Sequence, residues 1–223
     1  CVDQQTLDKL AAGRHGDPFA VLGPHATAVG DVVRVLLPGA RAVEAIDPAG
    51  AATALVHRGQ GLFEGPAPAG RRYRLRVEWP DSVQTTDDAY AVGPQLSDQD
   101  LYLFNEGRLF AMAATLGAVP MRVDGMCGVR FAVWAPNAQR VAVVGDFNTW
   151  DGRRHAMRRR YPSGIWEIFV PGLRPGECYK YEILGSNGEV LPLKADPLAR
   201  ATEHPPATAS IIAPPPEFTW IDH

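Results

Sequence analysis

The sequence contains one pattern of strand-like segments twice, and this repeat constrains the fold more than any other feature. The offset between matched segments grows steadily along the chain. Two copies of one fold that differ by insertions in their turns produce this behaviour. The matched segments are Val33-Arg34-Val35 with Val129-Arg130-Phe131, Pro38-Gly39-Ala40 with Pro136-Asn137-Ala138, Gly61-Leu62-Phe63-Glu64 with Gly164-Ile165-Trp166-Glu167, Gly70-Arg71-Arg72-Tyr73-Arg74-Leu75 with Gly176-Glu177-Cys178-Tyr179-Lys180-Tyr181, and Asp88-Ala89-Tyr90-Ala91 with Asp196-Pro197-Leu198-Ala199.

Within each copy the residues alternate as they do in half-buried antiparallel strands. The segment from Arg72 to Trp79 places its apolar side chains at every second position, which puts them on one face. Glycine (22 residues) and proline (20 residues) punctuate the 223-residue chain often enough to separate many short strands. The sequence therefore predicts a mainly all-β protein made of two tandem immunoglobulin-like β-sandwiches.

Two short helices are expected, one at the N-terminus and one between the sandwiches. Leu7, Leu10 and Ala11 share a helical face, and Asp3 is placed to cap that helix. A second helix over 98–116 begins after a capping-box-like Ser97. The predicted domains are residues 1–116, residues 117–213 and a proline-rich linker at 214–223.

Composition excludes several classes of function. A net charge of −3 makes nucleic acid and anionic membranes poor partners. No apolar run approaches the ~18–20 residues of a membrane span, and no signal peptide is recognisable. The three cysteines are far apart and the histidines form no metal-binding pattern, which predicts no metal, no cofactor and reduced thiols in the cytoplasm. The basic run over 153–160 has no interleaved aromatics and indicates a solvated or interdomain face.

Three motifs carry a resemblance to a known family. His15-Gly16-Asp17-Pro18-Phe19-Ala20-Val21-Leu22-Gly23-Pro24-His25 resembles the opening of the first N-terminal domain of bacterial glycogen branching enzymes. Gly128-Val129-Arg130-Phe131-Ala132-Val133-Trp134-Ala135-Pro136-Asn137-Ala138 resembles the first strand of a family-48 carbohydrate-binding module. The run Trp150-Asp151-Gly152-Arg153-Arg154-His155 is similar to the branching-enzyme version of that module.

The resemblance implies a part of an enzyme rather than a catalyst. Such enzymes cut an α-1,4-glucan and rejoin the released chain through an α-1,6 bond, using an Asp nucleophile and a Glu acid/base in a (β/α)8 barrel. That chemistry requires two carboxylates roughly 5–5.5 Å apart. The barrel motifs do not occur in this sequence, so we expect a noncatalytic N-terminal fragment whose partners are an α-glucan and the barrel of the same parent chain.

The resemblance also points to site residues. In starch- and glycogen-binding members the tryptophan matching Trp150 and the lysine matching Lys180 touch the sugar, whereas the second aromatic platform is replaced here by Val190 and Leu191. An alternative is that the Trp150 segment packs on the barrel. Trp134 and Trp166 are expected in the core. The residues expected at the barrel interface are Asp151, Arg153, Arg154 and His155.

Three other functions stay open at this point. In the first alternative, the modules bind no sugar and only set the orientation of the domains. In the second, they are the sugar-binding part of a glycogen debranching enzyme or trehalohydrolase. An extracellular adhesion module is disfavoured because the chain has neither a signal peptide nor paired cysteines.

Overall fold

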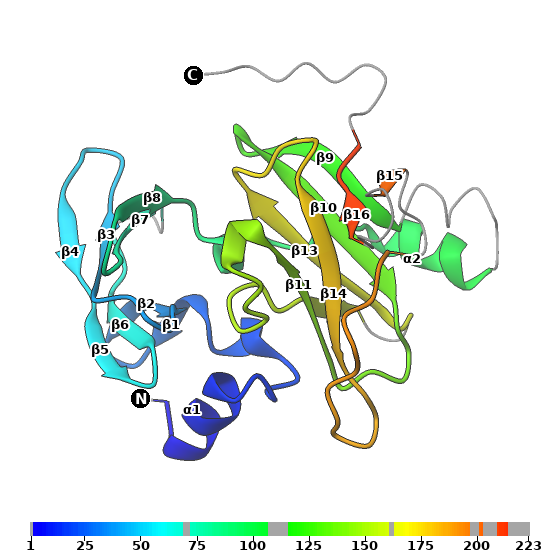
Figure 1. The fold of residues 1–223 in the computed structure, drawn as a ribbon. Coiled ribbons are helices and arrows are strands. Elements are labelled where there is room, and N and C mark those ends of the chain that lie inside the picture. Colours follow the sequence, from blue (N-terminus) through cyan, green and yellow to red (C-terminus); the bar gives the residue numbers. More distant parts are fainter. Residues whose placement is uncertain are drawn as a thin grey trace. The chain divides into compact units, whose positions relative to one another are not determined.

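The computed structural model describes residues 2–68, 72–106, 116–160, 163–196, 201–202 and 209–213. The chain divides into two compact units, residues 1–93 and residues 94–223, and the secondary structure of both is mainly antiparallel strand (Figure 1). The predicted linker at 214–223 and the second half of the helix predicted over 98–116 lie outside the described residues. Among the described residues, no helix has the length and apolar character needed to cross a membrane.

The first unit consists of two four-stranded sheets with short helical segments beside them. One sheet has the order β1-β2-β6-β5 and the other β4-β3-β7-β8. Val33, Val35, Val43, Leu75 and Val77 form the core that both sheets contribute to. The elements are α1 (Gln4–Ala11), η1 (Pro18–Ala20), β1 (Gly23–Thr27), β2 (Gly30–Leu36), β3 (Ala42–Ile46), β4 (Ala52–Ala54), β5 (Val56–Gly59), β6 (Leu62–Pro66), β7 (Arg74–Glu78), β8 (Val83–Thr86) and η3 (Ala89–Ala91).

The second unit repeats this arrangement, and its strands β10, β11, β13 and β14 are longer than the matching β2, β3, β6 and β7. Its sheets have the orders β12-β13-β10-β9 and β11-β14-β16-β15. Fully buried aromatic side chains, among them Phe131, Trp166, Tyr179 and Tyr181, fill its interior. The elements are α2 (Asp98–Asn105), β9 (Gly117–Val123), β10 (Met126–Trp134), β11 (Arg140–Gly145), η4 (Asp146–Asn148), β12 (Arg158–Arg160), β13 (Ile165–Pro171), β14 (Cys178–Leu184), β15 (Ala201–Thr202) and β16 (Ser210–Ile211).

The glycine that ends the turn before β6 in the first unit, and before β13 in the second, has the same geometry in both. Leu37 N donates to Gly61 O at 2.8 Å in the first unit, and Ala135 N donates to Gly164 O at 2.9 Å in the second. Both glycines have a positive φ, +88° and +76°, and a Cβ on either would come within 3.0 Å of a proline. Only glycine is tolerated at such a position. The matched glycines of the two copies are therefore explained by one shared turn.

A buried tyrosine–aspartate pair is also repeated. The Tyr73 hydroxyl donates to Asp88 at 2.6 Å, and the Tyr179 hydroxyl donates to Asp196 at 2.6 Å. Both carboxylates are 6% exposed. Burial and the neighbouring carboxylate hold the pKa of each tyrosine above its ordinary value. The loosest of the sequence matches, Asp88 with Asp196, thus has a structural counterpart.

One sequence match is wrong by two residues. The prediction pairs Val33 with Val129, but the strand registers Val33↔Gly65 and Phe131↔Ile168, combined with the shared glycine turn, make Val33 equivalent to Phe131. A shift of two residues keeps every side chain on its own face of the sheet, so the alternating pattern does not distinguish the two registers.

The segment before α2 is bonded to the second unit. The two compact units therefore divide after residue 93, whereas the sequence predicts a domain boundary after residue 116. Glu167 on β13 accepts hydrogen bonds from Leu96 N at 3.0 Å and Gln95 N at 3.3 Å. Arg160 donates to Leu96 O at 2.6 Å. Leu96 and Leu101 bury their side chains against the second unit. As predicted, Ser97 caps α2 through reciprocal bonds with Asp100, and Asp3 caps α1.

Candidate glucan-binding site

Trp150 lies in a tight turn that follows β11 and η4. Its backbone N donates to Gly145 O at 2.9 Å, and its indole Nε1 donates to Asp146 Oδ1 at 2.8 Å. Thr149 and Trp150 both have left-handed backbone conformations, with φ of 54° and 57°. Such a conformation costs roughly 1–2 kcal/mol per non-glycine residue and is found most often where function requires it. The turn therefore keeps the indole of Trp150 half-buried at the surface, although both residues would favour a negative φ.

The Trp150 turn crosses the face of the sheet on which Lys180 lies. Lys180 pairs with Val144 in the β11–β14 ladder, and successive residues of β14 point to opposite faces, so Lys180 shares its face with Glu182. The backbone of Gly152 lies directly against the Glu182 carboxylate, where a Cβ would come within 2.5 Å of it. Both sequence-predicted glucan ligands therefore belong to one surface of the second unit.

The residues after Trp150 stabilise the turn through contacts within it. Arg153 donates from Nε and Nη2 to the Asp151 carboxylate at 2.9 Å and 2.8 Å. Burial alone raises the pKa of Asp151, but the Arg153 hydrogen bonds outweigh burial, and the pKa lies below its ordinary value. His155 packs against the Phe147 ring at 5.7 Å. Arg154 and Arg153 are partly exposed beside this cluster.

His155 gives the second unit a specific pH dependence. Burial, together with the charge of Arg154, lowers the pKa of His155 from 6.5 to about 3. A depressed folded-state pKa stabilises the fold fully above pH 6.5, and this stabilisation is lost as the pH falls toward the folded pKa. We expect the His155 contribution to unfolding free energy to fall by about 2 kcal/mol between neutral pH and about pH 4.5.

The measurement is urea denaturation at several pH values, with wild type compared with His155→Asn. Subtracting the variant's profile matters because burial raises the pKa of Asp88, in the first unit, to about 6. That shift stabilises the fold at low pH and opposes the effect of His155. Parallel profiles for the two proteins would contradict the assignment to His155.

The other two tryptophans of this unit behave differently from each other. Trp166 is fully buried and its indole donates to Ala135 O at 3.0 Å, which confirms its predicted core position. The prediction for Trp134 is wrong, because its side chain is 53% exposed. Trp134 is the last residue of β10 and is not part of the cluster formed by Leu96, Leu101 and Ala132.

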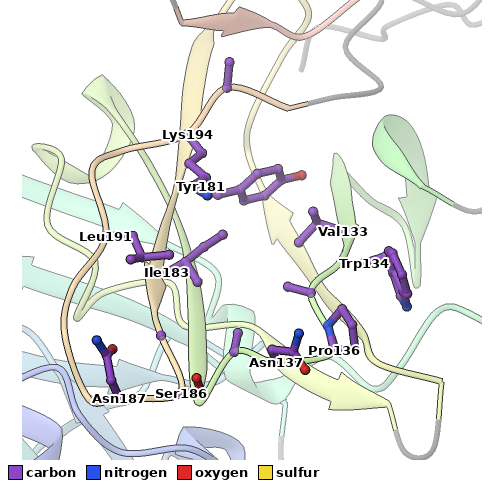
Figure 2. Close-up of a pocket in the computed structure, with 14 residues that line it drawn as sticks. Val133, Trp134, Pro136, Asn137, Tyr181, Ile183, Ser186, Asn187, Leu191 and Lys194 are labelled. Carbon is purple, nitrogen blue, oxygen red and sulfur yellow. The ribbon is translucent and has the colours of Figure 1, made fainter.

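Trp134 lies at a pocket of about 690 Å³ that the sequence did not indicate. Figure 2 shows Leu191 and Ile183 on one side of this pocket and Pro136 and Trp134 on the other. Along β14, the side chain of Ile183 points to one face, and those of Lys180 and Glu182 point to the other. This pocket and the Trp150 turn therefore lie on opposite faces of that strand. Val190, where the family resemblance predicts an aromatic ring, is 53% exposed.

Two family models match the chain. Residues 115–199 match the family model of carbohydrate-binding module 48 (isoamylase N-terminal domain). Residues 3–90 match the model of the alpha-1,4-glucan branching enzyme GlgB N-terminal domain. The paired sheets of the second unit and its match to the first of these models place the chain in the class of proteins that carry a carbohydrate-binding module.

Full-length relatives narrow the class to one family. The chain is 58% identical over 214 residues to the 1,4-alpha-glucan branching enzyme GlgB of Burkholderia vietnamiensis, covering 95% of this chain and 29% of that protein. It is 56% identical to the enzyme of the same name from Pseudomonas aeruginosa, covering 98% of this chain and 31% of that protein. The chain belongs to the N-terminal region of the GlgB branching enzymes, and it spans about 30% of the length of these curated relatives.

Among solved structures, the chain is similar to a pullulanase from Anoxybacillus sp. LM18-11 complexed with maltotetraose. The alignment covers 86% of this chain and 27% of the pullulanase chain, with a TM-score of 0.37 and 19% identity.

Proposed function

We propose that this chain holds an α-1,4-glucan, such as glycogen or a maltooligosaccharide, for the catalytic barrel of a glycogen branching enzyme. Trp150 and Lys180 contact the sugar, and Asp151, Arg153, Arg154 and His155 form the side that faces the barrel. The single observation that carries the proposal is the strained turn at Trp150, whose Gly152 lies against Glu182 on the Lys180 face of β14.

The chemistry of these side chains suits a glucan. An indole offers a flat apolar surface to the apolar face of a glucose ring, and the Trp150 ring is fixed by its hydrogen bond to Asp146. An ammonium group such as that of Lys180 donates up to three hydrogen bonds to sugar hydroxyls. Because Val190 offers no second ring, we expect weak binding that improves when several sites engage one polymer.

The buried carboxylates of the described residues support a binding role without catalysis. Asp88 and Asp196 each accept a tyrosine hydroxyl, and Glu167 is paired with Arg160 at 2.6 Å. A retaining glycosidase-type mechanism requires two carboxylates facing one substrate. These three instead stabilise the fold, and we assign the branching chemistry to the barrel of the longer protein. Cys127 and Cys178 form no disulfide among the described residues, which fits a cytoplasmic setting.

The test is retardation of the chain in native gels that contain glycogen. We expect Trp150→Ala to weaken glycogen binding by more than about tenfold, as the loss of a central aromatic contact does, and Lys180→Ala to weaken it less. Both variants should unfold at nearly the wild-type temperature.

Matched controls are Tyr102→Ala, which removes an exposed aromatic from α2, and Lys9→Ala, which removes an exposed lysine from α1. Equal retardation of wild type and Trp150→Ala would contradict the proposal. A wild-type chain that glycogen does not retard at all would favour a purely structural role.

A further inference from the structure

Asn148, at the end of η4, is a fully buried amide whose oxygen and nitrogen are hydrogen-bonded to β11 and to His155. Its Oδ1 accepts from Gly145 N at 3.0 Å, and its Nδ2 donates to Val143 O at 2.9 Å. The remaining Nδ2 proton is directed to His155 Nδ1 at 3.0 Å. An asparagine amide has two donor protons, so this set satisfies both and fixes the orientation of the side chain.

This arrangement determines the state of the His155 ring. Because Asn148 Nδ2 carries only donor protons, His155 Nδ1 must accept, and the ring proton resides on Nε2. The low pKa of His155 agrees with a ring that stays neutral. Val143 N donates to His155 O at 3.1 Å, which joins the backbone of His155 to the edge of β11. His155 therefore supports Asn148 from a position that is itself held by the sheet.

The two strained residues follow Asn148 directly. Thr149 and Trp150 keep their left-handed conformations only if the chain on both sides is held, since each would relax to an ordinary conformation if released. Before these two residues the chain is fixed by the hydrogen bonds of Asn148, and after them it is fixed by the Asp151–Arg153 ion pair. Losing the acceptor at His155 Nδ1 would leave a buried donor of Asn148 without a partner.

We propose that Asn148 and His155 are positioning residues of the glucan site, and that His155 acts through Asn148 to hold the Trp150 indole in its binding orientation. This inference rests on the proposed function of Trp150, and it assigns His155 a role within the sugar site.

Two isosteric variants test the proposal. In His155→Asn the side-chain oxygen occupies the place of Nδ1 and still accepts from Asn148, whereas in His155→Gln the amide lies one atom farther out, at the place of Nε2. Both are neutral amides, so they differ mainly in where the acceptor lies. The first readout needs no sugar and is the NMR resonance of the Trp150 indole N–H, which donates to Asp146. The second readout is retardation by glycogen.

We expect His155→Asn to keep the Trp150 resonance and the wild-type affinity. His155→Gln should displace that resonance and weaken glycogen binding by about tenfold, while the resonance of the buried Trp166 indole stays in place. A displaced Trp150 resonance with unchanged glycogen binding would uphold the positioning role and overturn the proposed function of Trp150. An unmoved Trp150 resonance in His155→Gln, or equal displacement in both variants, would overturn the positioning role itself.

Discussion

Replacing Trp166 with alanine is expected to destabilise the second unit by about 3–5 kcal/mol, which exceeds the effect of any other single tryptophan substitution in the described residues. The side chain is fully buried, and the guanidinium of Arg159 lies 5.7 Å from its ring centre. Truncation leaves a large cavity and removes the hydrogen bond to Ala135 O. The measurement is urea denaturation followed by circular dichroism.

Trp134→Ala is the matched control. Trp134 lies on β10, which pairs with the β13 strand of Trp166, but its side chain is 53% exposed. Its cost should stay below about 1 kcal/mol, near the range of surface substitutions. Similar losses for the two variants would contradict the core assignment of Trp166.

Replacing Glu167 with glutamine is expected to cost about 3–5 kcal/mol, because it removes the buried carboxylate that pairs with Arg160 and leaves, among the described residues, only the fully exposed Asp98, at 3.5 Å. Glu167 is 2% exposed and lies 2.6 Å from Arg160. Its second oxygen accepts the backbone N–H groups of Gln95 and Leu96. The same change should therefore expose the segment before α2 to limited proteolysis.

The repeat supplies a matched control for this substitution. Glu64 occupies the position equivalent to Glu167 in the first unit, where it pairs with Arg34 at 2.6 Å and Arg58 at 3.6 Å. Its side chain is 12% exposed, so water partly compensates the loss of charge. We expect Glu64→Gln to cost less than Glu167→Gln and to leave proteolysis near residue 95 unchanged. The reverse order would contradict the account of the boundary.

The repeat could be read from the sequence because glycine turns and buried aromatics leave signals that survive insertions. Gly61 and Gly164 occupy one strained turn, and Phe63 and Trp166 follow them at the same core position. The two-residue register error over Val129 arose because alternation alone identifies a face and not a position along the strand.

The site could be predicted only in part. The turn-rich neighbours of Trp150 indicate a loop, but neither threonine nor tryptophan favours a positive φ, so the sequence contains no signal for the strained pair. The role of Asn148 depends on contacts that form only when β11 and the segment at His155 come together. The exposure of Trp134 likewise depends on tertiary packing. Leu96 and Leu101 cover Ala132 on the same face of β10 but not Trp134, and the alternation of apolar residues does not reveal this.

The central claim is that the second unit binds α-glucan through Trp150, and the most direct test is an NMR titration of the tryptophan indole N–H resonances with maltoheptaose. The chain has five tryptophans, and tryptophan-to-phenylalanine variants assign their resonances. The account predicts that the Trp150 resonance moves in a saturable way while that of the buried Trp166 does not. If no resonance moves, or if the movement is confined to Trp134 at the pocket on the opposite face of β14, the claim is contradicted.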